Sequence, residues 1–323
     1  ALGLVPAVRF DVADHDVATV GADLTAQAES CVETALTQLD PQVPFAVVAL
    51  GRFAGGELSY ASDLDVLFVH DAAGAGNGDA QHEEGLRLAA GVLRFLAGST
   101  PAQRIYPIDA ALRPEGRQGP LSRSLDGYAA YLDRWAQTWE RQAFTRARPV
   151  AGDPELGQRF LDLLAGAVWD RPFTEEHERE IRGMKARVER ERIPPGEDPE
   201  FHLKLGRGSL SDIEWTVQLL QLRTGIRAPS TMGGLAALES AGVVDEVDAE
   251  VLRAAYRFCE RTRNRWWLVG SAPADADALP SRPNDLLHLA RSLDTTAGAL
   301  REDYRRVTRR ARRVVERLFY GSG

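Results

Sequence analysis

Residues 51–71 read GRFAGGELSYASDLDVLFVHD and join a glycine-rich turn to an apolar run that opens with two aspartates. The run before the turn, residues 45–50, is short and apolar and is bounded by Pro44 and Gly51, so it predicts a buried strand. Residues 64–69 predict a second strand. The glycines between them let the backbone turn sharply and bring its N–H groups close to a ligand. A strand–turn–strand unit with an acidic end is the first structural expectation.

Asp63 and Asp65 stand at positions i and i+2 at the start of the second predicted strand. Successive side chains of a strand point to opposite faces, so these two carboxylates share a face, roughly 7 Å apart at Cα. Two like charges there repel, and desolvating either one unpaired is costly. Mg²⁺ removes that cost, because it prefers oxygen ligands and is typically held by one or two carboxylates together with substrate phosphates. The alternative is a solvated acidic turn, the usual fate of an isolated D-x-D; the preceding strand, the glycine turn and Ser62 favour the metal site.

The pattern G-x-x-A-G-x-E-L-x-x-x-S-D-x-D over residues 51–65 resembles the nucleotidyltransferase motif of the glutamine-synthetase adenylyltransferase family, which belongs to the polymerase-β-like superfamily. Three further segments resemble the same family in the same order: IDAALRP at 108–114, WERQAFTRAR at 139–148 and KLGRGSLSDIEW at 204–215. The chain departs from the family pattern at Ala111, where many members carry Arg, and at Ser209, where they carry Gly. The first departure leaves Arg113 as the candidate for a phosphate contact.

The resemblance implies a set of site residues. Asp109 matches the family's third catalytic carboxylate, so Asp63, Asp65 and Asp109 are expected to be catalytic and to bind Mg²⁺, with two ions expected. ATP is the expected substrate, and its expected binding residues are Gly51, Arg52, Gly55, Gly56, Ser62, Arg113 and Lys204. Two alternatives are structural. Asp109 can form an ion pair with Arg113, and residues 204–214 can be the start of a helix capped by Ser209 or Ser211.

The resemblance also implies an activity, the transfer of AMP from ATP to a tyrosine of glutamine synthetase with release of pyrophosphate, in the regulation of nitrogen assimilation. Members often carry two such domains, one attaching AMP and one removing it by phosphorolysis. The LSDIEW segment is similar to the carboxy-terminal, attaching domain, so attachment is expected. The alternatives are phosphorolytic removal, or a non-catalytic module that binds the synthetase or a PII-type signal protein. The intact carboxylate trio argues against the module.

Composition adds limits on the class of protein. The formal net charge of -8 argues against a nucleic-acid partner, and so against an RNA nucleotidyltransferase, because phosphate neutralisation normally needs a basic surface. Cys31 and Cys259 cannot form a disulfide framework and suit a reducing, cytoplasmic setting. No apolar run approaches the roughly 20 residues of a membrane span, so no membrane association is expected. A chain that starts at Ala1 and not at Met suggests a piece of a longer protein.

The periodicity of the chain predicts an α+β protein. Helices are predicted over residues 1–40 and 81–97, strands near 104–112 and 119–122, and one long helix from Ser124 to about Ala147. After Pro154 the strand signal disappears, and helices are predicted at 155–167, 175–192, 212–224, 231–241, 245–269 and 295–320. We therefore expect a polymerase-β-like nucleotidyltransferase domain with a small mixed sheet over 1–153, followed by an α-helical bundle over 154–323.

Overall fold

The computed structural model describes residues 16–72, 78–193, 198–270 and 276–321. By its internal contacts the chain divides into two compact units. We call residues 21–58 and 62–172 the sheet unit, and residues 1–20, 59–61 and 173–323 the helical unit. The functional boundary expected at residue 153 stays a prediction.

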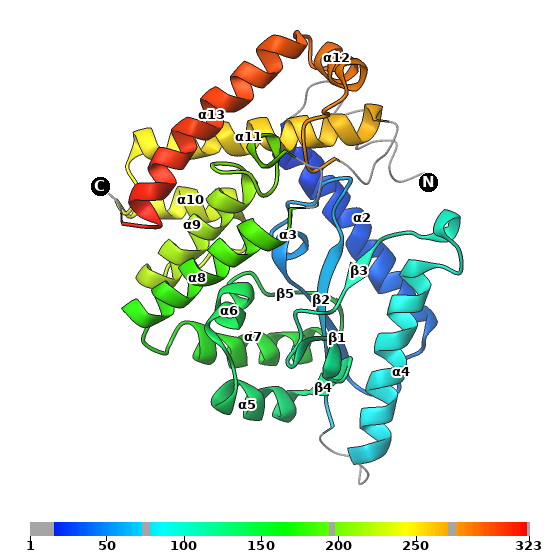
Figure 1. Ribbon diagram of the computed structural model, residues 1–323. Helices are drawn as coiled ribbons and strands as arrows, with labels where there is room; N and C mark the ends of the chain where they lie inside the picture. The colour runs from blue at the N-terminus through cyan, green and yellow to red at the C-terminus, as the bar shows by residue number, and fades with distance from the viewer. Residues whose placement is uncertain (1–15, 73–77, 194–197, 271–275, 322–323) are drawn as a thin grey trace. The chain divides into compact units, whose positions relative to one another are not determined.

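The sheet unit is built on five short strands in a mixed sheet (Figure 1). β1 (Phe45–Ala49) pairs antiparallel with β2 (Leu64–His70) and with β5 (Arg148–Gly152). β2 pairs in parallel with β3 (Ile108–Asp109) through its first residues and with β4 (Ser122–Ser124) through its last. All five residues of β1 are buried, because the strand lies between two neighbours and under helices. The predicted strands at 45–50 and 64–69 are confirmed.

Helices cover this sheet. α4 (Gly78–Ala97) packs on β2, β3 and β4, and α7 (Pro154–Val168) packs on β1, β2 and β5. α2 (Val17–Gln38) confirms the described part of the helix expected over 1–40, and residues 1–15 lie outside the described residues. The buried face of α4 carries Leu88, Val92 and Leu96, a helical repeat that the sequence displays.

The long helix predicted from Ser124 to Ala147 is wrong in part. Ser124 does cap a helix, accepting a hydrogen bond from the Gly127 N–H at 3.1 Å, but this helix, α5 (Leu125–Arg134), ends at Trp135. A second helix, α6 (Thr138–Phe144), restarts with Gln137 and Glu140 in a capping box. β5 then follows, a strand that no pattern in the sequence predicts. Its Pro149 lacks an N–H donor, which an edge strand tolerates.

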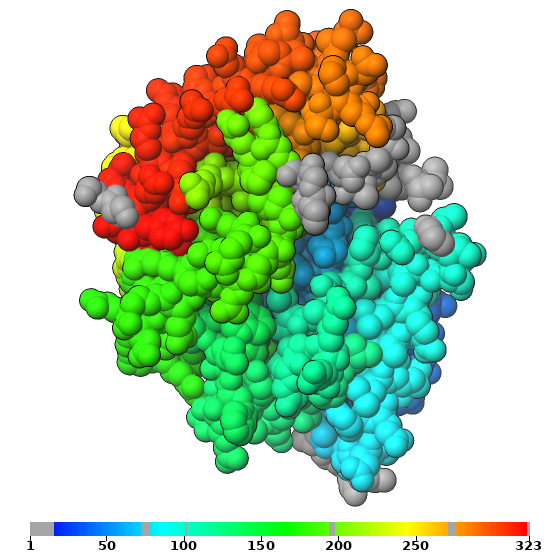
Figure 2. Space-filling model, viewed as in Figure 1, coloured from blue at the N-terminus to red at the C-terminus, as the bar shows by residue number. Residues whose placement is uncertain are grey.

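The described part of the helical unit contains α8 (Glu175–Glu191), α9 (Leu210–Thr224), α10 (Thr231–Ser240), α11 (Glu246–Val269), α12 (Pro283–Ser292) and α13 (Ala297–Leu318). All but α12 were predicted. α12 begins with Pro283 in its first turn, where the missing N–H costs nothing. The outer faces of α4 and α13 are open to solvent on the side shown in Figure 2.

None of the helices in the described ranges is long and apolar enough to cross a membrane. The small mixed sheet and the following helices confirm the α+β class.

Candidate active site

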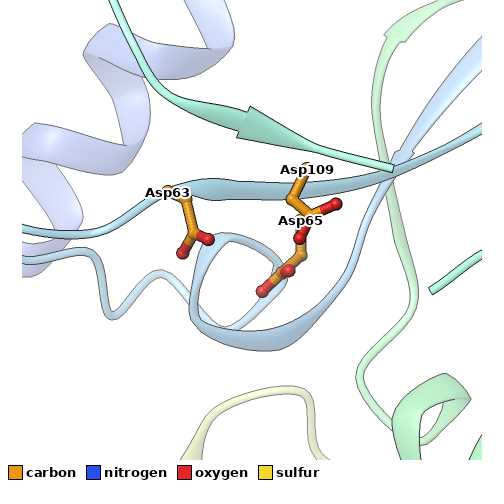
Figure 3. Close-up of side chains that lie close together, drawn as sticks. All are labelled: Asp63, Asp65 and Asp109. Carbon is orange, nitrogen blue, oxygen red and sulfur yellow. The ribbon is translucent and has the colours of Figure 1, made fainter. Parts of the chain in front are cut away.

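Three aspartates converge where β2 and β3 run side by side (Figure 3). Asp65 of β2 lies directly opposite Asp109 of β3 in the parallel pairing, and Asp63 immediately precedes β2. One carboxylate oxygen of each aspartate lies within 4.8 Å of the other two. Asp65 and Asp109 are half-buried, whereas Asp63 is exposed. The sequence-based expectation that Asp63 and Asp65 share a face agrees with this geometry.

Backbone hydrogen bonds hold the strands that carry these aspartates. The carbonyl of Asp65 accepts the Leu50 N–H at 2.9 Å, and the Leu64 N–H donates to the Pro107 carbonyl at 2.9 Å. One side-chain oxygen of Asp109 accepts the Ala111 N–H at 2.7 Å, which fixes the orientation of that carboxylate. The backbone positions of Asp65 and Asp109 therefore follow from the pairing of β2 with β3.

Gly51 is where the glycine-rich turn approaches the aspartates. The turn is a single short helical turn, α3 (Gly51–Ala54), and Gly51 has a φ of +52°. A Cβ on this residue would lie 2.6 Å from Oδ2 of Asp65. Gly56 also has a positive φ, +70°, but a Cβ there would meet nothing within 4 Å. Position 51 thus requires glycine for two reasons, conformation and close approach to a carboxylate, and position 56 for only one.

Two arginines from the WERQAFTRAR segment form hydrogen bonds and an ion pair with residues of this turn and with Glu57 just after it. Arg146 forms a 3.3 Å ion pair with Glu57, and both side chains are nearly buried. Arg148 donates from Nε to the Ala54 carbonyl at 2.9 Å and from Nη2 to the Phe53 carbonyl at 3.3 Å. These contacts were not predicted from the sequence, because Glu57 and Arg146 are 89 positions apart and no local pattern links them.

The remaining predicted nucleotide-binding residues fall in both units. Gly55, Arg52 and Ser62 lie in the sheet unit with the aspartates, and Ser62 is buried. Arg113 is also in the sheet unit, buried, and donates to the carbonyls of Ala110 at 2.8 Å and Gly119 at 3.0 Å. These bonds close the loop after β3. An ion pair between Arg113 and Asp109 was the structural alternative for Asp109, but Arg113 donates to backbone carbonyls and Asp109 accepts the Ala111 N–H. Lys204 belongs to the helical unit. Nucleotide binding by all of them stays a prediction.

The motif at 204–215 builds the core of the helical unit. A Cβ on Gly208, whose φ is +77°, would lie 2.0 Å from the Thr308 carbonyl, so only glycine lets α13 pack on this turn. Asp212 is buried, accepts the Gly208 N–H at 2.7 Å, and forms ion pairs with Lys185 and Arg312. Burial alone would raise the pKa of Asp212, but Lys185 and Arg312 hold it below its usual range. Ser209 is the N-cap residue of α9, as one alternative had it, although its hydroxyl donates backwards to the Gly206 carbonyl.

A small mixed sheet whose neighbouring strands bring three carboxylates together beside a glycine-rich turn is the arrangement of the nucleotidyltransferase class. A family model described as glutamate-ammonia ligase adenylyltransferase matches residues 11–163, and one described as PII-uridylyltransferase matches residues 176–320. The chain belongs to the glutamate-ammonia ligase adenylyltransferase family.

Curated relatives extend the similarity over both units. A protein of Streptomyces coelicolor is 45% identical over 287 residues, which cover 85% of this chain and 28% of the relative. A protein of Streptomyces avermitilis is 43% identical over 332 residues, covering 99% of this chain and 32% of the relative. A protein of Mycolicibacterium smegmatis is 42% identical over 325 residues, covering 95% of this chain and 32% of the relative. Each is named bifunctional glutamine synthetase adenylyltransferase/adenylyl-removing enzyme. The chain thus spans less than a third of the length of these relatives.

Proposed function

We propose that the chain transfers AMP from ATP to a tyrosine hydroxyl of glutamine synthetase and releases pyrophosphate. The observation that carries the proposal is the register of β2 and β3, which places Asp65 opposite Asp109 and brings Asp63 to the same point. The names of the relatives supply the protein substrate, since they are called glutamine synthetase adenylyltransferases.

The donor set fits a hard divalent cation. Three carboxylate oxygens within 4.8 Å of one another are the ligands that Mg²⁺ prefers, so Asp63, Asp65 and Asp109 would hold it, with two ions expected. When bound, Mg²⁺ neutralises charge on the attacking and leaving oxygens of an in-line displacement.

The chain's own residues supply positioning and a base. The attacking hydroxyl must lose its proton, and a tyrosine with a pKa of about 10 is mostly protonated at neutral pH. Asp109, fixed through one oxygen by the Ala111 N–H, accepts that proton. The tyrosine oxygen then bonds to the α-phosphorus of ATP as the bond to the pyrophosphate oxygen breaks. Phosphate contacts within the sheet unit are assigned to the turn, to Ser62 and to the basic side chains: Gly51, Arg52, Gly55, Gly56, Ser62 and Arg113. Nucleotide binding by Lys204 of the helical unit stays a separate prediction.

The setting of the reaction follows from two further observations. The second family model is described as a PII-uridylyltransferase, which supports a PII-type signal protein as a regulatory partner of the helical unit. Both Cys31 and Cys259 are free thiols, which supports a cytoplasmic location.

A labelling experiment tests the function. Incubation with Mg²⁺, unmodified glutamine synthetase and ATP labelled at the α-phosphate should label the synthetase, and Asp65→Asn should abolish labelling. Asp71→Asn, which changes an aspartate just beyond the other end of β2 that pairs with Arg159, should leave it intact. Release of ADP from AMP-synthetase and phosphate, without labelling, would assign the opposite direction. If Asp63→Asn and Asp65→Asn behave as the parent in both assays, the chain is not the enzyme.

A further inference from the structure

The three residues before Ser62 belong to the helical unit. Leu58 and Ser62 group with the sheet unit, but Ser59–Ala61 groups with the helical unit. Asp63 follows this segment directly. The chain thus changes units twice within a few residues of a metal-binding carboxylate.

α11 holds the segment at two points. The guanidinium of Arg263 donates a hydrogen bond to the hydroxyl of Ser59, and both side chains are buried. The ring of Tyr60 stacks on Trp267, with ring centroids 5.1 Å apart and an angle of 17° between the rings. Arg263 and Trp267 are four residues apart, so they share one face of α11.

Arg263 is itself fixed. Its Nε donates to Oδ1 of Asp277 at 2.5 Å, and its side chain is only 2% exposed. Burial alone would raise the pKa of Asp277, but Arg263 and Lys204 hold it below its usual range. Asp277 is therefore a carboxylate that orients one edge of the guanidinium while the other edge reaches Ser59. A planar guanidinium with donors on two edges suits this bridging role.

The covalent chain carries this restraint to the metal ligands. Four peptide units separate Ser59 from Asp63, so their Cα atoms can be at most about 15 Å apart. Upstream, Leu58 is buried and Glu57 is paired with Arg146. Downstream, Leu64 begins β2. Asp63 is the exposed member of the triad and lies outside β2, so its position depends on this segment.

We propose that Arg263 is a positioning residue for the metal-binding carboxylates: through the Ser59 hydroxyl it fixes the path of the segment that carries Ser62 and Asp63. The proposal rests on the proposed function, because it assigns a purpose to the position of Asp63. Lys204 contributes to the same arrangement, since its N–H donates to the Asp277 carbonyl at 3.3 Å and its charge helps to keep Asp277 ionised.

The test compares Arg263→Gln with Arg253→Gln. Arg253 is also on α11, roughly 15 Å along the helix, and pairs with Glu239 and Glu250. The readouts are kcat, the KM for ATP, and Mn²⁺ binding followed by electron paramagnetic resonance. Arg263→Gln should lower kcat by about 10- to 100-fold, the range expected for displacing a catalytic group by about 1 Å, and weaken Mn²⁺ binding severalfold. The KM for ATP should change by less than about threefold. Arg253→Gln should change neither kcat nor Mn²⁺ binding.

A second variant separates positioning from loss of folding. Ser59→Ala removes one hydroxyl outside any helix and should change kcat and Mn²⁺ binding in the same direction, by less. Both substitutions break the same hydrogen bond between Arg263 and Ser59. The double variant should therefore lose no more kcat or Mn²⁺ binding than Arg263→Gln alone. Additive effects, or wild-type kcat and Mn²⁺ binding in Arg263→Gln, would overturn the proposal. If the parent shows no AMP transfer in either direction, the proposed function fails, and Mn²⁺ binding by the same variants still decides the positioning role.

Discussion

Replacing Gly51 with alanine should separate the conformational role of this glycine from its contact with Asp65. The added methyl would lie 2.6 Å from Oδ2 of Asp65, and ordinary van der Waals contact begins at 3.4 Å. The carboxylate oxygen, the turn or both must therefore move by about 0.8 Å. Gly56→Ala is the matched control, because its φ is also positive, at +70°, but its methyl would meet nothing within 4 Å.

The size of each effect follows from two contributions, the cost of a positive φ and the displacement of Asp65. A non-glycine residue in the left-handed region costs roughly 1–2 kcal/mol, so both variants should lose that much unfolding free energy. Only Gly51→Ala displaces Asp65, a proposed metal ligand. Misplacing a catalytic group by about 1 Å costs on the order of 100-fold in rate, which corresponds to about 2.7 kcal/mol in the activation free energy.

The assay is AMP transfer to glutamine synthetase over a range of Mg²⁺ concentrations, with urea unfolding of the same preparations. Gly51→Ala should lower kcat by about 10- to 100-fold and require more Mg²⁺ for half its maximal rate, whereas Gly56→Ala should keep kcat within about threefold of the parent. Equal losses of activity in the two variants, after equal losses of stability, would show that the contact between Gly51 and Asp65 has no part in holding the carboxylate.

Three further predictions concern charge. In EDTA, Asp65→Asn should melt about 1–3 °C above the parent, since it removes repulsion of up to about 1 kcal/mol among the three carboxylates, and Mg²⁺ should abolish the difference; a lower Tm in EDTA would contradict this. Asp212→Asn should cost about 3–5 kcal/mol of unfolding free energy in a urea titration, because it leaves Lys185 and Arg312 without their buried partner, whereas Asp303→Asn, which breaks an exposed pair with Arg306, should cost less than about 0.5 kcal/mol. Burial lowers the pKa of His202 to about 4 from an ordinary 6.5, so between these values the unfolded chain binds a proton that the folded chain does not, and stability falls as the pH falls. His202→Asn, which retains an acceptor for the Lys204 and Leu205 N–H groups, should flatten that dependence by up to about 1.4 kcal/mol per pH unit, and an unchanged slope would exclude His202 as its source.

The sequence predicts best where a local pattern determines the structure. The apolar runs at 45–50 and 64–69 both identify strands, because hydrophobic patterning is a property of consecutive residues. β5 cannot be predicted in this way. It contains a proline and follows a helical pattern without a gap, and it becomes a strand only because β1 offers an unpaired edge. The break between α5 and α6 cannot be predicted in this way either, since the Tyr128 to Trp139 spacing reads as one continuous apolar face.

The candidate site likewise contains residues that the sequence predicts and contacts that it does not. The two aspartates of D-x-D follow from strand geometry, and Asp109 follows from resemblance to a family. Nothing in the sequence shows that β3 places Asp109 opposite Asp65, because parallel pairing joins residues far apart in the chain. The supporting contacts are longer still: Arg146 reaches Glu57 across 89 positions and Arg263 reaches Ser59 across 204. Pairs of this kind leave no periodic signal, so only the structure reveals them.

The three carboxylates are held by different means, and this difference bears on control of the site. Asp65 and Asp109 are fixed by the ladder between β2 and β3, which the sheet unit forms by itself. Asp63 lies outside that ladder, on a segment whose preceding residues contact α11. A change in the helical unit that moves Arg263 or Trp267 would therefore disturb one carboxylate and leave the other two in place. In the proposed metal site, Asp63 is therefore the ligand whose position depends on contacts with α11, whereas Asp65 and Asp109 depend on the β2–β3 pairing alone, so a substitution at Arg263 should weaken metal binding without unfolding the sheet.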